Sequence, residues 1–427
     1  MTVEVTRLAN GLTVATDAMA EAQSVALGVW IGVGTRHEVP QENGVAHLLE
    51  HMLFKGTRRR SAQDIAEEVE AVGGHLNAYT GREVTAYHAK LLPEDLALGV
   101  DLLADILQHS RFEEQELERE RQVVLQEIGQ AEDTPDDIIF DHFQETAFPE
   151  QGLGRPVLGR PEIVASLARA QVAGFQARSY GSERMVLAAA GAVRHEDFLA
   201  LAERHFTELP RESNVIHEAP AYRGGDYREA RELEQLHLLL GFEGLGFRDP
   251  DYHAAAAFSV AFGGGMSSRL FQELRERRGL VYSVFSFAAA QRDSGLFGVY
   301  AGTGEAQVRE LLPLLCEEWL KVAEEGLGDA ELARAKAQLR ASIAMGRERS
   351  ENRVEHLAGQ LLVHGRPMSA AEILAKVEAV DNAAIRRVAQ RLLASPPTLA
   401  ALGPLGGLEA PEALRARLRG AAALPRA

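Results

Sequence analysis

Hydrophobic and polar positions alternate near the start of the chain and then change to helical spacing. A turn at Asn10-Gly11 separates two short alternating segments, and apolar residues recur with period two over residues 24–33. Over residues 44–54 the apolar positions follow helical spacing, and Lys55-Gly56 supplies a basic last turn and a helix-stopping glycine. The pattern therefore predicts strand, turn, strand, strand and helix.

The elements expected next are a second helix, a pair of strands and two long amphipathic helices. Residues Ser61 to Asp64 have the form of a capping box, and the helix that they open ends at Gly73-Gly74. Alternation then predicts strands at Leu76–Thr80 and 84–91. Helical spacing returns over about 93–109 and 113–131.

This order of elements returns about 205 residues later, in the second half of the chain. A strand over 236–242, a helix over 249–262 and a serine-capped helix from Ser267 are followed by strands over 281–287 and 295–302. The repeat predicts an α+β fold of two homologous domains, each a mainly antiparallel sheet packed by helices.

Between the two halves the pattern fails. Pro210, Pro220, Gly224-Gly225 and mixed charges are typical of a linker, which we place at 213–230. The predicted domains are therefore 1–212, which would carry the chemistry described below, and 231–427.

The composition is that of an ordinary globular protein of about two domains. The 427 residues are 46% hydrophobic and 25% charged, with 45 Lys+Arg against 62 Asp+Glu, a net charge of −17. This acidic balance argues against nucleic-acid binding, which needs a basic surface. The one cysteine, Cys316, cannot form an intrachain disulfide, and its apolar neighbours indicate a buried thiol.

The first residues alternate like a strand and show no basic segment followed by an apolar one. No later stretch reaches the length of a membrane span. We therefore expect a soluble, cytoplasmic protein without a membrane span.

The pentapeptide His47-Leu-Leu-Glu50-His51 indicates chemistry most directly. On a helix His47 and His51 share one face and can bind one metal ion, while Glu50 is close enough to reach a water at that ion. Catalytic zinc uses three protein ligands and keeps one position open, so a third ligand is required. The order of residues matches the inverted His-x-x-Glu-His signature, although such a pattern also occurs by chance on surface helices.

In the second half, Ala254 to Ala257 stand where the first half carries these residues. If the duplication is real, only the first half carries the chemistry.

The helix predicted over 113–131 offers the third ligand. Glu120 and Glu127 share one face of it, and the neighbouring Val123 and Ile128 mark that side as buried. A carboxylate that faces a core needs a partner to offset its desolvation, and a metal is one such partner. We predict Glu127 as the third ligand and Glu120 as a group that orients a ligand, although an ordinary charge pair explains Glu120 equally well.

The residues around these positions resemble the pitrilysin/insulinase family of zinc peptidases. The resemblance rests on residues 47–57, on residues 73–80, and on Glu127, which follows His51 by 76 residues, as in the family. It is strongest toward short bacterial members and the β subunit of mitochondrial processing peptidase, and it covers nearly the whole chain. It implies a zinc endopeptidase that forms one half of a clamshell, with one Zn²⁺ per chain. The implied metal ligands are His47, His51 and Glu127, and Glu50 is the implied general base, with Glu120 beside them.

In the second half, Arg275 and Tyr282 resemble the family's C-terminal arginine–tyrosine element. Both side chains can donate to a substrate carbonyl or a developing oxyanion, which gives them candidate catalytic and substrate-binding roles. From the residues alone, a solvated helix end and a half-buried strand aromatic explain them as well.

The resemblance also implies that an extended peptide pairs with Leu76–Thr80, with main-chain contacts from Asn77 and Ala78, if that segment is an edge strand and not an interior one.

Family members enclose their substrate between two halves of about this chain's length. Because one chain carries both the zinc motif and the Arg275–Tyr282 pair, we expect a homodimer in which each chain lends that pair to the other's zinc. A heterodimer with a related chain is the alternative.

Two other functions remain open, a non-catalytic scaffold of the kind found in respiratory complexes and a catalytic half that requires a partner chain. The net charge leads us to expect a preference for basic peptides.

Overall fold

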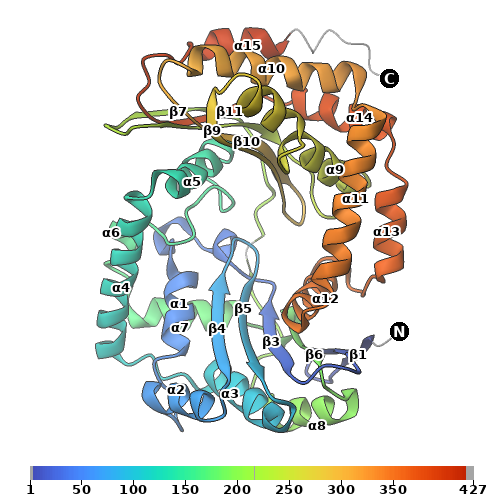
Figure 1. Ribbon diagram of the computed structural model, residues 1–427. Helices are drawn as coiled ribbons and strands as arrows, with labels where there is room; N and C mark the ends of the chain where they lie inside the picture. The colour runs from blue at the N-terminus through green and yellow to red at the C-terminus, as the bar shows by residue number, and fades with distance from the viewer. Residues whose placement is uncertain (1–2, 216, 420–427) are drawn as a thin grey trace. The chain divides into compact units, whose positions relative to one another are not determined.

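The computed structural model describes residues 3–215 and 217–419 and contains two compact units (Figure 1). Unit 1 comprises Met1–Gln130, Arg155–Glu218 and Met345–Met368, and unit 2 comprises Ala131–Gly154, Ala219–Ala344 and Ser369–Ala427. The first two residues of the predicted first strand, Ile216 of the predicted linker and the last eight residues of the predicted second domain lie outside the described residues.

Unit 1 is built on a six-stranded sheet in the order β1-β2-β6-β3-β5-β4. All neighbouring strands are antiparallel except β2 and β6, which are parallel. The segment predicted as a possible edge strand, β4, does lie at an edge. The strands are β1 Val3–Arg7, β2 Thr13–Ala18, β3 Val25–Ile31, β4 His75–Thr80, β5 Thr85–Leu91 and β6 Met185–Gly191.

One face of this sheet carries the main hydrophobic core of unit 1. Alternate residues of β3, such as Leu27 and Val29, are fully buried there against the apolar sides of α1 and α3, such as Leu48 and Leu103. The helices of unit 1 are α1 Val45–Leu53, α2 Ala62–Ala71, α3 Leu96–His109, α4 Glu114–Glu132, α6 Pro161–Val164, α7 Arg169–Ser179, α8 His195–His205 and α12 Ser350–His364. The last two residues of α4 belong to unit 2, because the boundary between the units follows Gln130.

The other face of the sheet is covered by α12, which comes from the second half of the chain. Its apolar residues Val354 and Leu361 pack with Trp30 and the alanines of β6. Arg353 donates twice to Asp17 at 2.7 Å. The sheet of unit 1 is therefore buried on both faces, and its long runs of buried residues follow from this.

Unit 2 repeats this architecture with a five-stranded sheet in the order β7-β11-β8-β10-β9, again with one parallel pair, β7 and β11. Here α5, from the first half of the chain, packs against β7, β8 and β11, while α9 and α14 pack against β9 and β8 (Figure 1). The strands are β7 Gly225–Ala230, β8 Leu236–Glu243, β9 Val281–Ala290, β10 Gly295–Thr303 and β11 Thr398–Gly403. The helices are α5 Pro135–Ala147, α9 Tyr252–Gly263, α10 Val308–Glu325, α11 Asp329–Gly346, α13 Ala370–Glu378, α14 Asn382–Leu393 and α15 Pro411–Arg419.

Two mixed α/β units with corresponding strand orders confirm the predicted fold class. The compact units nevertheless differ from the continuous ranges 1–212 and 231–427, because α5 and α12 each pack on the sheet formed mainly by the other half. The last six residues of the predicted linker form β7, and the serine-capped helix of the second half is a short π-helical segment, Phe271–Glu276.

Cys316 is buried in the core of unit 2. In the part of the chain that the structure describes, no helix has the length and apolar character to cross a bilayer.

The loop that follows α1 is fixed by a buried carboxylate on α3. The Asp105 side chain is fully buried and accepts hydrogen bonds from the Thr57 hydroxyl at 2.8 Å, from Arg59 at 3.1 Å and from Arg60 at 2.9 Å. Burial alone would raise the pKa of Asp105, but the bonds from Arg60, Thr57 and Arg59 hold it below its usual value.

Replacing this carboxylate should destabilise unit 1. We expect Asp105→Ala to lower the free energy of unfolding by about 3 kcal/mol, because two guanidinium groups lose a buried partner. Since the folded pKa is depressed, the stabilisation is present above the usual aspartate pKa of about 3.9 and is lost as pH falls through the folded value. Urea unfolding between about pH 7 and pH 3 measures both effects. Asp197→Ala, at an exposed position, is the control, and a loss below about 1 kcal/mol would contradict the prediction.

Candidate metal centre

The helix that carries both histidines is held at its start by a second buried carboxylate. Glu38 accepts hydrogen bonds from the main-chain N–H of Gly44 at 3.0 Å and of Ala46 at 2.8 Å, and from the Asn43 amide at 2.9 Å. Gly44 has φ 96°, and a Cβ there would meet Val164 at 2.7 Å. These contacts satisfy the N–H of Gly44, just before α1, and that of Ala46 in its first turn, and they help to fix the direction of the helix.

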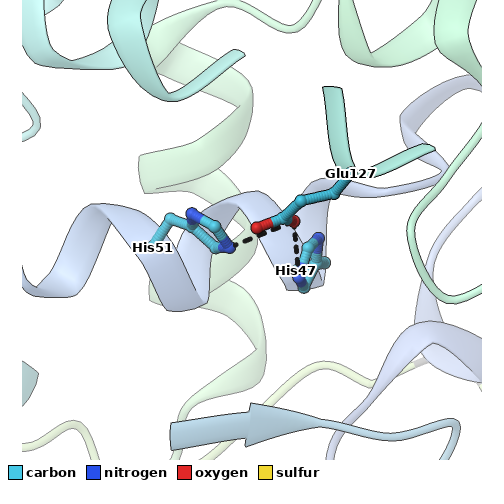
Figure 2. A group of neighbouring side chains, drawn as sticks. All are labelled: His47, His51 and Glu127. Atoms are coloured by element: carbon cyan, nitrogen blue, oxygen red, sulfur yellow. Dashed lines mark ion pairs between the residues drawn. The ribbon is translucent and has the colours of Figure 1, made fainter. Parts of the chain in front are cut away.

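Three side chains converge beside α1, as Figure 2 shows. Oε2 of Glu127, on α4, lies 3.7 Å from Nε2 of His47 and 3.6 Å from Nε2 of His51. The two imidazole rings are 4.7 Å apart at an angle of 73°. Spacing on α1 brings the histidines together, and α4 supplies the carboxylate from a different part of the chain.

These distances fit a small metal ion. Nitrogen and oxygen ligands about 2.0–2.1 Å from a tetrahedral zinc lie about 3.3–3.5 Å from one another. Burial, with a contribution from His51, lowers the pKa of His47 to about 4, so its imidazole is neutral near pH 7 and one of its two ring nitrogens has a free lone pair. The donor set of two imidazoles and one carboxylate suits zinc, and the residues present therefore fit the ion that the sequence predicts.

Glu120 joins His51 to a lysine that the sequence analysis missed. Its Oε2 lies 3.0 Å from Nδ1 of His51, and its Oε1 lies 2.8 Å from Nζ of Lys55. Burial alone would raise the pKa of Glu120, but the bonds with His51 and Lys55 lower it. An ionised Glu120 holds the proton of His51 on Nδ1 and leaves Nε2 for a metal. Lys55 follows His51 by four residues, and this spacing was the available signal.

The carboxylate of Glu50 lies beside this group and contacts the edge strand. Its Oε2 accepts a hydrogen bond from the Thr80 hydroxyl at 2.5 Å, a partner that the sequence analysis also missed. Burial raises the pKa of Glu50 above its usual value, against the opposing effects of Thr80 and His51, and the charge of Glu127 adds to the rise. A raised pKa suits a carboxylate that takes up and releases a proton near neutral pH.

The structure places Asn77 and Ala78 on β4. The Ala78 N–H donates to Oδ1 of Asn77 at 2.8 Å. Gly81 N–H donates to the Val84 carbonyl, and hydrogen-bonded pairs alternate along an antiparallel ladder, so the main chain of Asn77 faces β5 and that of Ala78 faces the free edge. By this register the Asn77 side chain is the part of that residue left for the free edge, and the substrate contact expected of Asn77 stays a prediction.

Arg275 and Tyr282 belong to unit 2, whereas the three converging side chains belong to unit 1. The Arg275 guanidinium lies 5.7 Å from the centre of the Tyr282 ring and 4.9 Å from that of Phe271. The Tyr282 side chain is 73% exposed. The structure therefore brings the predicted pair together on a solvent-exposed surface.

Two repeated α+β units, one of them with an inverted His-x-x-Glu-His helix and a carboxylate from a second helix, define the class of two-domain zinc peptidases. Residues 13–161 match the sequence profile of the insulinase family, peptidase family M16, and residues 166–339 match the profile described as the M16 inactive domain. The chain belongs to peptidase family M16, which confirms the resemblance seen in the sequence.

Several relatives match almost the whole chain. A zinc protease of Streptomyces coelicolor, described as uncharacterized, is 40% identical over 413 residues, 95% of this chain and 90% of that protein. A probable β subunit of the mitochondrial-processing peptidase of Arabidopsis thaliana is 36% identical over 419 residues, 95% of this chain and 79% of that protein. The crystal structure of a protease from Helicobacter pylori has the same fold, with a TM-score of 0.86 and 23% identity over 94% of this chain and 99% of that chain.

Proposed function

We propose that this chain is a zinc-dependent endopeptidase that hydrolyses peptides bound in an extended form. The observation that carries the proposal is the position of Glu50, a half-buried carboxylate next to the three converging side chains of His47, His51 and Glu127. A scaffold protein has no need of a proton-accepting group at that place.

The residues divide the chemistry between them. A zinc ion held by His47, His51 and Glu127 would acidify the attacking water and polarise the scissile carbonyl. Glu50 takes the proton from that water and returns it to the leaving amine, while Thr80 holds one of its two oxygens. Glu120 fixes the ring of His51 through Nδ1. Arg275 and Tyr282 would donate to the carbonyl oxygen or to the oxyanion that forms from it.

The free edge of β4 suits an extended peptide. By the ladder register, the main-chain N–H and C=O groups of Leu76, Ala78 and Thr80 point away from β5. A peptide strand can pair with these groups, and its side chains then alternate between the two faces of the sheet. The Asn77 side chain, which bonds to the Ala78 N–H, would have to yield that group to the substrate. The net charge of −17 favours basic peptides.

Removal and return of the metal tests this function. The purified chain should cleave a library of quenched peptides, lose that activity with a chelator and regain it with about one equivalent of zinc per chain. Magnesium is the control, because it prefers oxygen ligands and should restore nothing. A chain that holds zinc and cleaves no peptide when alone would favour a partner-dependent half or a scaffold.

We also propose a homodimer in which each chain lends Arg275 and Tyr282 to the zinc site of the other. The proposal is supported by the presence of both elements in one chain, on different units. Mixing Glu50→Gln with Tyr282→Phe should then restore part of the wild-type activity, since one intact site can form per mixed dimer. Each variant mixed with itself is the control. No recovery after confirmed exchange of subunits would contradict a shared site.

A further inference from the structure

Thr80 is the last residue of β4, and its side chain and its main chain face different parts of the site. Its hydroxyl donates to Oε2 of Glu50 at 2.5 Å. Its main-chain N–H and C=O lie on the free edge of the strand, by the register that places Gly81 opposite Val84. One residue thus contacts both the proposed base and the proposed docking edge.

The position of Glu50 depends strongly on this contact. Within the described residues, 3–215 and 217–419, no second side chain is hydrogen-bonded to the Glu50 carboxylate. A donor on Oε2 limits rotation of the carboxylate and leaves Oε1 for the attacking water. Because Thr is branched at Cβ, its hydroxyl direction follows the local backbone conformation closely.

The strand is also held from its other face, by α12. Tyr79, the neighbour of Thr80, donates its hydroxyl to Glu355, which also accepts from Nε1 of Trp30 at 2.9 Å. Successive side chains of a strand point to opposite faces, so Tyr79 is tied to α12 while Thr80 is directed toward α1. What remains free to respond to a ligand is the open edge of β4, where an added strand would order the backbone at Thr80.

We infer that Thr80 is a positioning residue through which a peptide docked on β4 orients Glu50 for proton transfer. This inference rests on the proposed function, because it requires Glu50 as base and β4 as docking edge. Docking that reaches Thr80 then raises the rate of the chemical step in addition to strengthening binding. A displacement of a catalytic group by about 1 Å costs about 100-fold in rate.

Two substitutions and two substrates separate this role from a structural one. Thr80→Val keeps the branched shape and the strand preference but has no hydroxyl, and Thr80→Ser keeps the hydroxyl. A short quenched peptide is compared with versions extended by about four residues on each side. In the wild type, extension should raise kcat as well as lower KM.

In Thr80→Val, we expect kcat for the extended peptide to fall by about 10- to 100-fold, with KM and bound zinc unchanged. Extension should then lower KM only, and Thr80→Ser should restore kcat to within a few-fold of the wild type. The inference is overturned if Thr80→Val keeps the wild-type kcat, if extension still raises its kcat, or if kcat and zinc are lost together.

A second measurement does not require activity. In zinc-free protein, a double-mutant cycle of Thr80→Val and Glu50→Ala should give melting-temperature shifts that do not add, because the two residues share one bond. Additive shifts would refute the positioning role of Thr80 and leave the proposed function of the chain untouched. A wild-type chain that binds zinc and cleaves nothing refutes the proposed function, and the role of Thr80 with it.

Discussion

Replacing Glu50 with glutamine should lower kcat by about 1000-fold while the chain keeps its zinc. Glutamine has nearly the size of glutamate, and its carbonyl oxygen can still accept the Thr80 hydroxyl, so the site should keep its shape. It cannot accept a proton from water at neutral pH, and loss of general acid–base catalysis costs about 100- to 10,000-fold. Kinetics with a quenched peptide, together with metal analysis of the same samples, measures both quantities.

The matched control is Glu118→Gln, which changes the net charge by the same amount at an exposed position of α4. It should leave kcat within about two-fold of the wild type. Zinc bound to Glu50→Gln with undiminished cleavage would remove Glu50 as the base. Loss of zinc from this variant would instead mean that Glu50 helps to hold the ion.

The arrangement of the three converging side chains could be predicted from the sequence because it depends on local rules. A four-residue spacing puts His47 and His51 on one face of a helix whatever the rest of the fold does. Of the two apolar neighbours that we took to mark the inward side of the Glu127 helix, Ile128 is buried, but the prediction for Val123 was wrong, since its side chain is exposed. The structure brings these three side chains within reach of one ion, whereas their roles as ligands stay predictions until metal is measured.

Other features depend on contacts between distant segments and leave no local trace. The pattern of α12 shows an apolar side, as that of any packed helix does, but it does not say that the sheet of unit 1 will cover it. The contact of Thr80 with Glu50 joins a strand to a helix 30 residues earlier. The strand β7 was missed because its charged residues Asp226, Arg228 and Glu229 conceal the alternation.

Glu120 and Glu127 lie seven residues apart on α4, and zinc affinity should distinguish their roles. Glu127 is directed at Nε2 of both histidines, at 3.6 and 3.7 Å, whereas Glu120 meets Nδ1 of His51 and Lys55. Glutamine at position 127 is neutral, and its amide oxygen is a weaker zinc ligand than the carboxylate oxygen that it replaces. We therefore expect Glu127→Gln to weaken zinc binding by more than about 100-fold, and Glu120→Gln by about 10- to 100-fold.

Competition with a chromophoric chelator measures both affinities, with Glu118→Gln as the control for charge on the same helix. The reason for the order is physical. Glu120→Gln leaves all three ligand atoms in place and removes only the carboxylate that holds the proton of His51 on Nδ1, so the site loses orientation and keeps its donors. If the order were reversed, with Glu120→Gln the more damaging change, α4 would have to turn or shift so that Glu120 replaces Glu127 at the metal. The hydrogen bond from Lys55 to Glu120 opposes such a movement, and a Lys55→Met variant should then bind zinc more tightly, not less.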